Sequence, residues 1–532
     1  GGAFGGKEDQ ATPWAVIAAL GARITGRPVK LVLSRHDDMR MTGKRHPYSS
    51  DYKLGLAADG RILAYEVVFH QNSGAAADLS TAIMERSLLH ATGPYFVPNA
   101  RITGHCCRTN LPPCTAFRGF GGPQAMFVIE AALDRGAQSL GIDQSALRRM
   151  NLLGDGDAFP FGMRVERCRA RRCFDDAVER YGFLALAEEA RRFNAEQALV
   201  KRGVSVVPIC FGISFTNTIL NQAGALVHVY TDGAVAVNTG AVEMGQGVNT
   251  KLLAIAAATL GVPREFVTIE NTSTGKVANT SPTAASSGAD INGRAAQMAC
   301  EQIRERLLGV AARALGAPED QLSIRDGAVL HGGAASGLDW VGLVGAAYAS
   351  RVNLSAQAHF ATPGIGYDRT KERGTPFAYH VWGAAVSEVT LDCLRGTYAF
   401  DRVLVTHDAG SSLDELIDRG QVEGALLQGI GWLTMEEVVY GRDGRLLTDT
   451  LSTYKVPDLL SAPRVEIAFL DDADNPLAVL GSKAVGEPPF LYGMGTYLAL
   501  VEAMRAYRPD REVDHLAPLT HERVLLFLHG RT

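Results

Sequence analysis

The segment Ala-Phe-Arg-Gly-Phe-Gly-Gly-Pro-Gln (116–124) places three glycines beside two aromatic residues and an arginine, directly before a predicted helix over residues 124–140. It is too polar and too rich in glycine for a core, and glycine lets a backbone approach a ligand closely. Taken alone, the segment is also typical of a tight turn. Five further segments share its character and lie where predicted elements begin or end: Gly-Gly-Ala-Phe-Gly-Gly-Lys-Glu (1–8), Phe-Gly-Ile-Ser-Phe-Thr (211–216), Glu-Met-Gly-Gln-Gly (243–247), Ser-Pro-Thr-Ala-Ala-Ser (281–286) and Val-Gly-Glu-Pro-Pro-Phe (485–490).

The hydrophobic pattern around these segments predicts a mixed α+β protein. Helices are expected over 9–26, 124–140, 184–195, 248–260, 292–315, 417–431 and 497–507, and single strands over 30–34 and 266–270. Hairpins are expected for 50–56 with 62–69, 225–230 with 234–238, and 383–392 with 397–406. An arginine-rich stretch is typical of a solvated connector, which predicts a first domain over 1–160, a connector over 161–205 and a second domain over 206–532.

Composition excludes several classes of protein. The chain has 532 residues, 46% of them hydrophobic, and a formal net charge of −5. An intrinsically disordered chain would have few apolar residues and a high net charge, and a nucleic-acid-binding protein would carry an excess of basic residues. No apolar run approaches the ~20 residues of a membrane-spanning helix. We therefore expect no nucleic acid and no membrane as partners.

The cysteines indicate the redox environment of the protein, and the first residues indicate whether more of it lies upstream. None of the eight cysteines lies in a Cys-x-x-Cys pair, so they do not resemble a zinc site, an iron–sulfur motif or a secreted disulfide framework. Reduced thiols in a cytoplasmic protein are the expectation. The chain opens on a glycine-rich segment without an initiator Met, which leads us to expect further protein upstream of residue 1.

Together and in this order, the six segments resemble the molybdenum-binding part of the xanthine dehydrogenase family and, less closely, the aldehyde oxidases. The connecting sequences Asn-Gln-Ala-Gly-Ala (221–225), Gly-Gln-Val-Glu-Gly-Ala (420–425) and Ser-Thr-Tyr-Lys-Val-Pro (452–457) agree. The resemblance covers nearly the whole chain. It implies two elongated mixed α/β domains with a molybdopterin cofactor between them, the first domain lacking its N-terminal part.

The resemblance also implies how the cofactor is held. The molybdenum, with oxo, sulfido and hydroxo ligands, is bound through the sulfur atoms of its own pterin and needs no protein side chain as a metal ligand. The residues implied to contact the molybdenum centre or the pterin are Phe4, Gly5, Arg118, Gln246, Ala285, Ser286 and Gln421. The first three do so through their backbones. For Gln246 and Gln421, capping of a helix N-terminus is the alternative.

Glu487 is the predicted general base. Two prolines and Phe490 follow it, so its backbone is restricted and its surroundings are partly apolar. A general base needs to be held firmly near the proton that it removes. A glutamate in a loop is more often a surface residue, but the family resemblance implies that this one deprotonates the molybdenum-bound hydroxyl.

The resemblance implies that five residues bind and recognise the substrate. Glu8 and Arg86 lie across a purine from each other in the family pattern, and the arginine would stabilise negative charge that develops on a purine oxygen. Phe120 and Phe215 would clamp a flat ring, and Thr216 would add a hydrogen bond. The alternatives are a surface ion pair of Arg86 with a neighbour such as Glu85, and a core role for either phenylalanine.

The implied activity is oxidation of hypoxanthine to xanthine and of xanthine to urate with oxygen from water. Electrons would leave through the pterin to [2Fe–2S] clusters and FAD on another segment or subunit, in an assembly expected to be a cytoplasmic dimer. Whether NAD or oxygen is the final acceptor stays open. One alternative is an aldehyde oxidase-like hydroxylase, disfavoured by Arg86 and Glu8, and another is a catalytically inactive homologue, disfavoured by Glu487. A carbon monoxide dehydrogenase is excluded because Gly119 stands where its copper-binding cysteine is expected and Cys114 comes too early.

Overall fold

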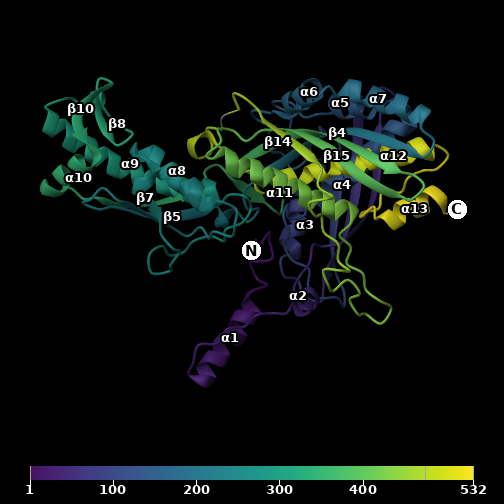
Figure 1. Cartoon of the computed structure of the whole chain (residues 1–532), viewed down its shortest axis with the longest axis horizontal. Helices are drawn as coiled ribbons and strands as arrows, with labels where there is room; N and C mark the ends of the chain where they lie inside the picture. Colours follow the sequence, from purple (N-terminus) through teal and green to yellow (C-terminus); the bar gives the residue numbers. More distant parts are fainter. Residues whose placement is uncertain (1, 474, 531–532) are drawn as a thin grey trace.

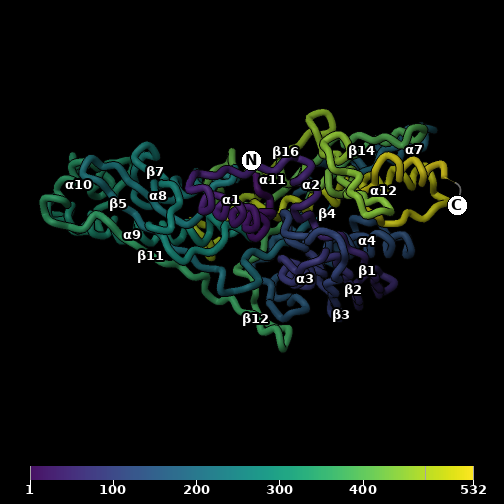
Figure 2. The backbone as a smooth tube through the Cα atoms, turned by 90° about the horizontal axis from the view of Figure 1, so that it is seen from below, coloured from purple at the N-terminus to yellow at the C-terminus, as the bar shows by residue number. Residues whose placement is uncertain are grey.

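The computed structural model describes residues 2–473 and 475–530 and shows an elongated mixed α/β protein, as the sequence predicts (Figure 1). A large body holds the central sheet and the C-terminus, and a lobe extends from it. Helix α1 (Thr12–Thr25) projects away from the body in Figure 1, and Figure 2 shows a smaller sheet below the body in that view. Within the described residues, no helix is long and apolar enough to cross a membrane.

The central sheet has the strand order β16-β15-β14-β4. Its strands are β4 (Val200–Ile213), β14 (Tyr379–Asp392), β15 (Thr397–His407) and β16 (Arg464–Phe469). Strand β14 is antiparallel to β4 and to β15, which confirms the hairpin predicted for 383–406, and β15 runs parallel to β16. Successive side chains of a strand point to opposite faces of the sheet, and here side chains on both faces are buried. Helices therefore cover the sheet on each side.

Two sets of helices cover this sheet. On one face lie α6 (Ala170–Arg180) and α7 (Phe183–Glu196), within the predicted connector 161–205. Against the other face pack α11 (Glu415–Thr434) and α12 (Gly493–Tyr507), both near their predicted positions. The remaining helices of the body are α4 (Gly122–Leu140), α5 (Gln144–Met150) and α13 (His521–His529).

The lobe lies between β4 and β14 in the sequence and has a core of its own. Its sheets have the orders β11-β5-β6-β7 and β10-β9-β8, and three helices pack with them. Its elements are β5 (Gln222–Val229), β6 (Val235–Thr239), α8 (Val248–Leu260), β7 (Val267–Ile269), α9 (Gly288–Leu315), β8 (Leu322–Arg325), β9 (Ala328–His331), β10 (Ala334–Asp339), α10 (Trp340–Ala349) and β11 (Ser355–Ala361). A small hairpin, β12 (Gly366–Asp368) with β13 (Arg373–Thr375), follows.

The third sheet is formed near the N-terminus, in the order β1-β2-β3. The predicted hairpin is confirmed by β1 (Tyr48–Leu56) and β2 (Ile62–Gly74), and β3 (Ala100–Arg108) runs parallel to β2. The helices of this region are α2 (Arg35–Met41) and α3 (Ser80–Leu89). Short 3-10 helices are η1 (Thr218–Leu220), η2 (Arg264–Phe266), η3 (Glu319–Gln321), η4 (Val479–Gly481) and η5 (Pro488–Tyr492).

The strand predicted over residues 30–34 is wrong. The segment is irregular, and Val32, expected to be buried, is 76% exposed. Three consecutive apolar residues predict burial only where a neighbouring strand is present to pair with the backbone. Helix α1 begins at Thr12 rather than at the predicted residue 9, because Pro13 is favoured in the first turn of a helix.

Candidate functional site

Glu487 lies at the centre of a set of hydrogen bonds that joins three distant segments. Its backbone N–H donates to Ser286 Oγ at 2.8 Å, and that hydroxyl donates to Glu487 Oε2 at 2.9 Å. The backbone N–H of Gly119 donates to Oε1 at 3.1 Å. Both carboxylate oxygens are thus oriented, and the half-buried Glu487 directly precedes η5, whose first two residues are prolines.

Arg118 ties the first half of the chain to the second beside this carboxylate. Its Nε–H donates to the carbonyl of Gly486 at 2.5 Å, and its terminal nitrogens donate to Gln428 Oε1 at 3.1 Å and Gln421 Oε1 at 2.9 Å. Burial lowers the pKa of Arg118 to about 10, and the charge of Glu487 opposes that shift. Arg118 therefore stays protonated at neutral pH and adds positive charge beside Glu487.

Close backbone approach explains two of the glycines. A Cβ on Gly5 would come within 2.7 Å of the carbonyl group of Ala116, so the 2–8 loop can pack against the 116–124 segment only with glycine there. A Cβ on Gly486 would come within 2.7 Å of Ser286 Oγ. Phe4 is exposed, and its ring centre is 6.0 Å from Arg118 Cζ. The Phe4 ring is thus near Arg118, and Gly5 packs against the neighbouring Ala116. Their predicted contacts with the cofactor stay predictions.

Gln246 and Gln421 lie next to each other and do not cap helix N-termini. The side chain of Gln246 bonds within its own loop, accepting from the Met244 N–H and donating to the Val242 carbonyl. Gln421 lies inside α11, where its Oε1 accepts from Arg118 and its Nε2 donates to the Gln246 carbonyl at 3.5 Å. The capping alternative is wrong for both, and Gln421 joins the Gln246 loop to Arg118.

Ala285 and Ser286 both have a left-handed backbone, with φ of 55° and 56°. Such a conformation costs energy in residues other than glycine and is found most often at functional sites. It lets Ser286 Oγ reach Glu487 just before α9 begins. Phe120, which directly follows Gly119, is half-buried and also left-handed, with φ of 47°.

Arg86 is 1% exposed and lies on α3. It donates to the carbonyls of Gly212 (2.9 Å) and Ser214, and its guanidinium lies over the rings of Phe211 and Phe377. Its Nε–H has no partner among the described residues. Burial lowers the pKa of Arg86, and the charge of Glu487 opposes the shift.

The proposed ion pair of Arg86 with Glu85 is wrong, because Glu85 Oε1 is 2.5 Å from Arg369 Nε instead. Burial would raise the pKa of Glu85, but the hydrogen bonds from Arg369 and Thr216 outweigh it and lower the pKa. The half-buried Phe215 follows the Ser214 carbonyl to which Arg86 donates, and its backbone is fixed by both ends of the Asn221 amide. The 211–216 segment and Arg86 therefore form one unit.

Glu8 is half-buried beside Lys7. Its carboxylate is 3.4 Å from Lys7 Nζ, and burial raises its pKa. Two residues further on, Gln10 donates to Asp78 at 2.7 Å, next to the start of α3, the helix that carries Arg86. The helix also contacts the 116–124 segment, since Ser87 Oγ donates to the Gly121 carbonyl.

Arg45 is a site residue that sequence reasoning missed. Its guanidinium lies 4.5 Å from the ring centres of Phe117 and Phe490, and it donates to the Arg118 carbonyl at 2.7 Å. Burial lowers the pKa of Arg45 to about 9. Arg45 lies in the loop between α2 and β1, where no hydrophobic periodicity marks a residue as buried. Its partners are also far away in the sequence.

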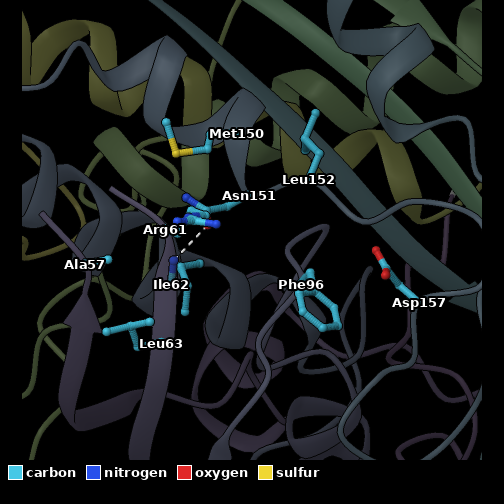
Figure 3. Close-up of a pocket in the computed structure, with 9 residues that line it drawn as sticks. All are labelled: Ala57, Arg61, Ile62, Leu63, Phe96, Met150, Asn151, Leu152 and Asp157. Atoms are coloured by element: carbon cyan, nitrogen blue, oxygen red, sulfur yellow. Dashed lines mark hydrogen bonds between the residues drawn. The ribbon is translucent and has the colours of Figure 1, made fainter. Parts of the chain in front are cut away.

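A separate cavity of about 540 Å³ lies beside the start of β2 and the end of α5, and none of the predicted site residues lines it (Figure 3). Ile62, Phe96, Met150 and Leu152 supply its apolar lining, and Arg61 and Asp157 are its charged residues. The candidate site is instead defined by the hydrogen bonds around Glu487.

The residues gathered around Glu487 fit a cofactor that brings its own metal ligands. They offer amides, hydroxyls and backbone N–H groups, which suit the polar edge of a pterin and an anionic phosphate. Among the described residues, no three His, Cys, Asp or Glu side chains are grouped so as to hold a metal ion.

Sequence comparisons match the chain to one family. Models described as molybdopterin cofactor-binding domain match residues 1–152 and 176–463. Xanthine dehydrogenase/oxidase of Rattus norvegicus is 43% identical over 509 residues, which is 96% of this chain and 37% of that protein. Xanthine dehydrogenase of Dictyostelium discoideum is 39% identical over 98% of this chain and 38% of its own length. The chain thus spans less than two fifths of these relatives.

Solved structures resemble the whole chain. Quinoline 2-oxidoreductase from Pseudomonas putida 86 has a TM-score of 0.87 and 26% identity, covering 100% of this chain and 68% of that one. Aldehyde oxidoreductase from Desulfovibrio gigas has a TM-score of 0.84 and 26% identity, covering 99% of this chain and 54% of that one.

Proposed function

Because the chain belongs to the molybdopterin cofactor-binding domain family, we propose that it is the molybdenum-binding part of a xanthine dehydrogenase. The proposed reactions are hypoxanthine to xanthine and xanthine to urate, with water as the source of oxygen. The observation that carries the proposal is the Glu487 carboxylate, whose two oxygens are oriented by Gly119 and Ser286 beside the protonated Arg118.

The cofactor would be held by uncharged groups around this carboxylate. Gln246, Gln421, Ala285 and Ser286 would contact the centre or its pterin, and Phe4, Gly5 and Arg118 would approach through their backbones. When bound, the group supplies the water-derived nucleophile and takes up the electron pair from the substrate. The protein's own part is to hold the cofactor and substrate and to move a proton.

Glu487 would remove that proton. The Gly119 N–H and the Ser286 hydroxyl fix the two oxygens, so the carboxylate is directed rather than free to rotate. A base held in this way loses little orientational freedom when the substrate reacts.

Arg86 and Glu8 would read a purine between Phe120 and Phe215, with Thr216 nearby. The buried Arg86 Nε–H lacks a partner among the described residues, and a buried donor of this kind is rarely left unpaired. A substrate oxygen would satisfy it and would gain a charge-assisted hydrogen bond as negative charge develops there.

An aldehyde oxidase-like activity is the second candidate. The similarity to quinoline and aldehyde oxidoreductases favours it, as do the bonds from Arg86 to the Gly212 and Ser214 carbonyls, which give the arginine a structural task.

The complete protein with an Arg86→Met substitution separates the two candidates. Loss of a charge-assisted hydrogen bond in a desolvated site costs roughly 2–4 kcal/mol, or about 30- to 1,000-fold in kcat. Xanthine turnover should fall by this amount, whereas benzaldehyde, which lacks the purine oxygen, should lose little. Equal losses on both substrates would assign Arg86 to pocket structure and remove the main support for a purine. Arg86→Lys is the control that keeps the charge.

Electrons would leave through the pterin to [2Fe–2S] clusters and FAD on another segment or subunit of a cytoplasmic dimer. The support is that the relatives are much longer than this chain. Iron and flavin analysis of the 532-residue chain purified alone tests this assignment. Stoichiometric iron bound to it would contradict the assignment.

A further inference from the structure

Tyr379, the first residue of β14, connects two segments of the candidate site through one oxygen atom. Its buried hydroxyl donates to Asp290 Oδ2 at 2.6 Å and accepts from the Ala484 N–H at 3.0 Å. A phenolic hydroxyl has one hydrogen to donate, and here that hydrogen is directed at a carboxylate. The same atom therefore sets the position of both partners.

Both partners lie close in sequence to the residues that orient the predicted base. Asp290 is in the first turn of α9, four residues after Ser286, and Ala484 is three residues before Glu487. Ser286 and Glu487 already bond to each other. The two segments are thus joined twice, once at Ser286–Glu487 and once through Tyr379.

We propose that Tyr379 is a positioning residue that fixes the Glu487 segment relative to the Ser286 segment and so acts on catalysis through Glu487. This rests on the proposed role of Glu487 as the base. Tyr379 is not assigned any contact with substrate or cofactor.

The residues on either side of Ala484 are held by other partners, whereas Ala484 itself bonds to Tyr379. Before Ala484, the buried Lys483 pairs with Asp408, and its N–H donates to the Ala409 carbonyl. After it, Arg118 bonds to the Gly486 carbonyl. Ala484 itself is buried, and its N–H is directed at the tyrosine hydroxyl. Removing that hydroxyl leaves a buried N–H without its acceptor, which favours a shift of the segment.

A small cavity limits the expected effect. A space of about 20 Å³ lies beside Tyr379, Asp290 and Ser287. This is room for about one water molecule. In a Tyr379→Phe variant, water in this space would satisfy the two groups without fixing their separation. We therefore expect the segment to move but the protein to fold.

The test uses the complete molybdenum-loaded protein with xanthine. A misplacement of about 1 Å at a catalytic group costs on the order of 10²-fold, so Tyr379→Phe should lower kcat by roughly 10- to 100-fold. KM for xanthine should change by less than about threefold, since uniform substrate binding is not altered. Molybdenum content should be unchanged. The matched control is Tyr398→Phe in β15, because the half-buried Tyr398 donates its hydroxyl hydrogen to the Leu519 and Thr434 carbonyls, away from the candidate site.

A double-mutant cycle separates positioning from a general structural effect. If Tyr379 acts through Glu487, the Tyr379→Phe change should cause no further loss in a Glu487→Gln background, measured in single turnovers. Two losses that multiply would overturn the proposal, as would a Tyr379→Phe enzyme with normal kcat.

Two substitutions at the other partner keep the proposal testable if Tyr379→Phe is unstable. Asp290→Asn retains an oxygen that can accept from the hydroxyl and should keep kcat within about threefold of the parent, whereas Asp290→Ala should lose about as much as Tyr379→Phe. Equal kcat for the two Asp290 variants would overturn the proposal. Normal turnover by Glu487→Gln would instead refute the proposed base.

Discussion

The Ser286→Ala substitution removes the hydroxyl that both accepts from the Glu487 N–H and donates to its Oε2. The bond to the charged oxygen contributes about 1.5–3 kcal/mol. With the Gly119 N–H still bound to Oε1, the carboxylate becomes free to turn about that single contact. Since 1.36 kcal/mol corresponds to tenfold in rate, kcat for xanthine should fall by roughly 10- to 150-fold.

The assay is steady-state turnover of the complete protein, with molybdenum content measured on the same samples. Ser287→Ala is the matched control, because the adjacent Ser287 hydroxyl donates to the Ala284 carbonyl and not to Glu487. We expect normal kcat for Ser287→Ala and full molybdenum content for both variants. Equal kcat in the two variants would refute the reasoning, and a fall in Ser286→Ala that only tracks lost molybdenum would assign Ser286 to cofactor retention.

Two further predictions concern stability. Arg45→Met removes the bond to the Arg118 carbonyl and the contacts with Phe117 and Phe490. Losing a buried charge offsets part of this loss, so the free energy of unfolding should fall by about 1–3 kcal/mol in urea titrations. An unchanged unfolding midpoint would contradict this prediction. Burial raises the pKa of Asp290 to about 6 from 3.8, so the unfolded state releases this proton first and the wild-type protein should lose stability as pH rises from about 4 to 6. Asp290→Asn should therefore be more stable than the parent by about 3 kcal/mol at pH 8 and nearly equal to it at pH 4. A difference that does not change with pH would contradict the assignment.

Local pattern was enough for elements with clear boundaries. Helix α8 begins after Gly247 and ends before Gly261, both with positive φ, and its observed bounds are the predicted ones. The hairpins were predicted because alternating residues flank a short turn. The segment at 30–34 was mispredicted because an apolar run does not reveal whether a pairing strand is present.

The family resemblance brought out several residues that the fold places together: Glu487, Ser286, Arg118 and Gln421. Their proposed roles stay predictions. Arg45 and Tyr379 could not be found in this way, because each acts through backbone groups far away in the sequence. Contacts of that kind depend on tertiary packing and leave no mark in a short motif.

The most direct test of the account is kcat for xanthine in a Glu487→Gln variant of the complete protein, with molybdenum content as the control. The amide keeps the size of the side chain but cannot act as the base. The account predicts a loss of at least ~10²- to 10⁴-fold with molybdenum content unchanged. Near-normal turnover at saturating xanthine would contradict it.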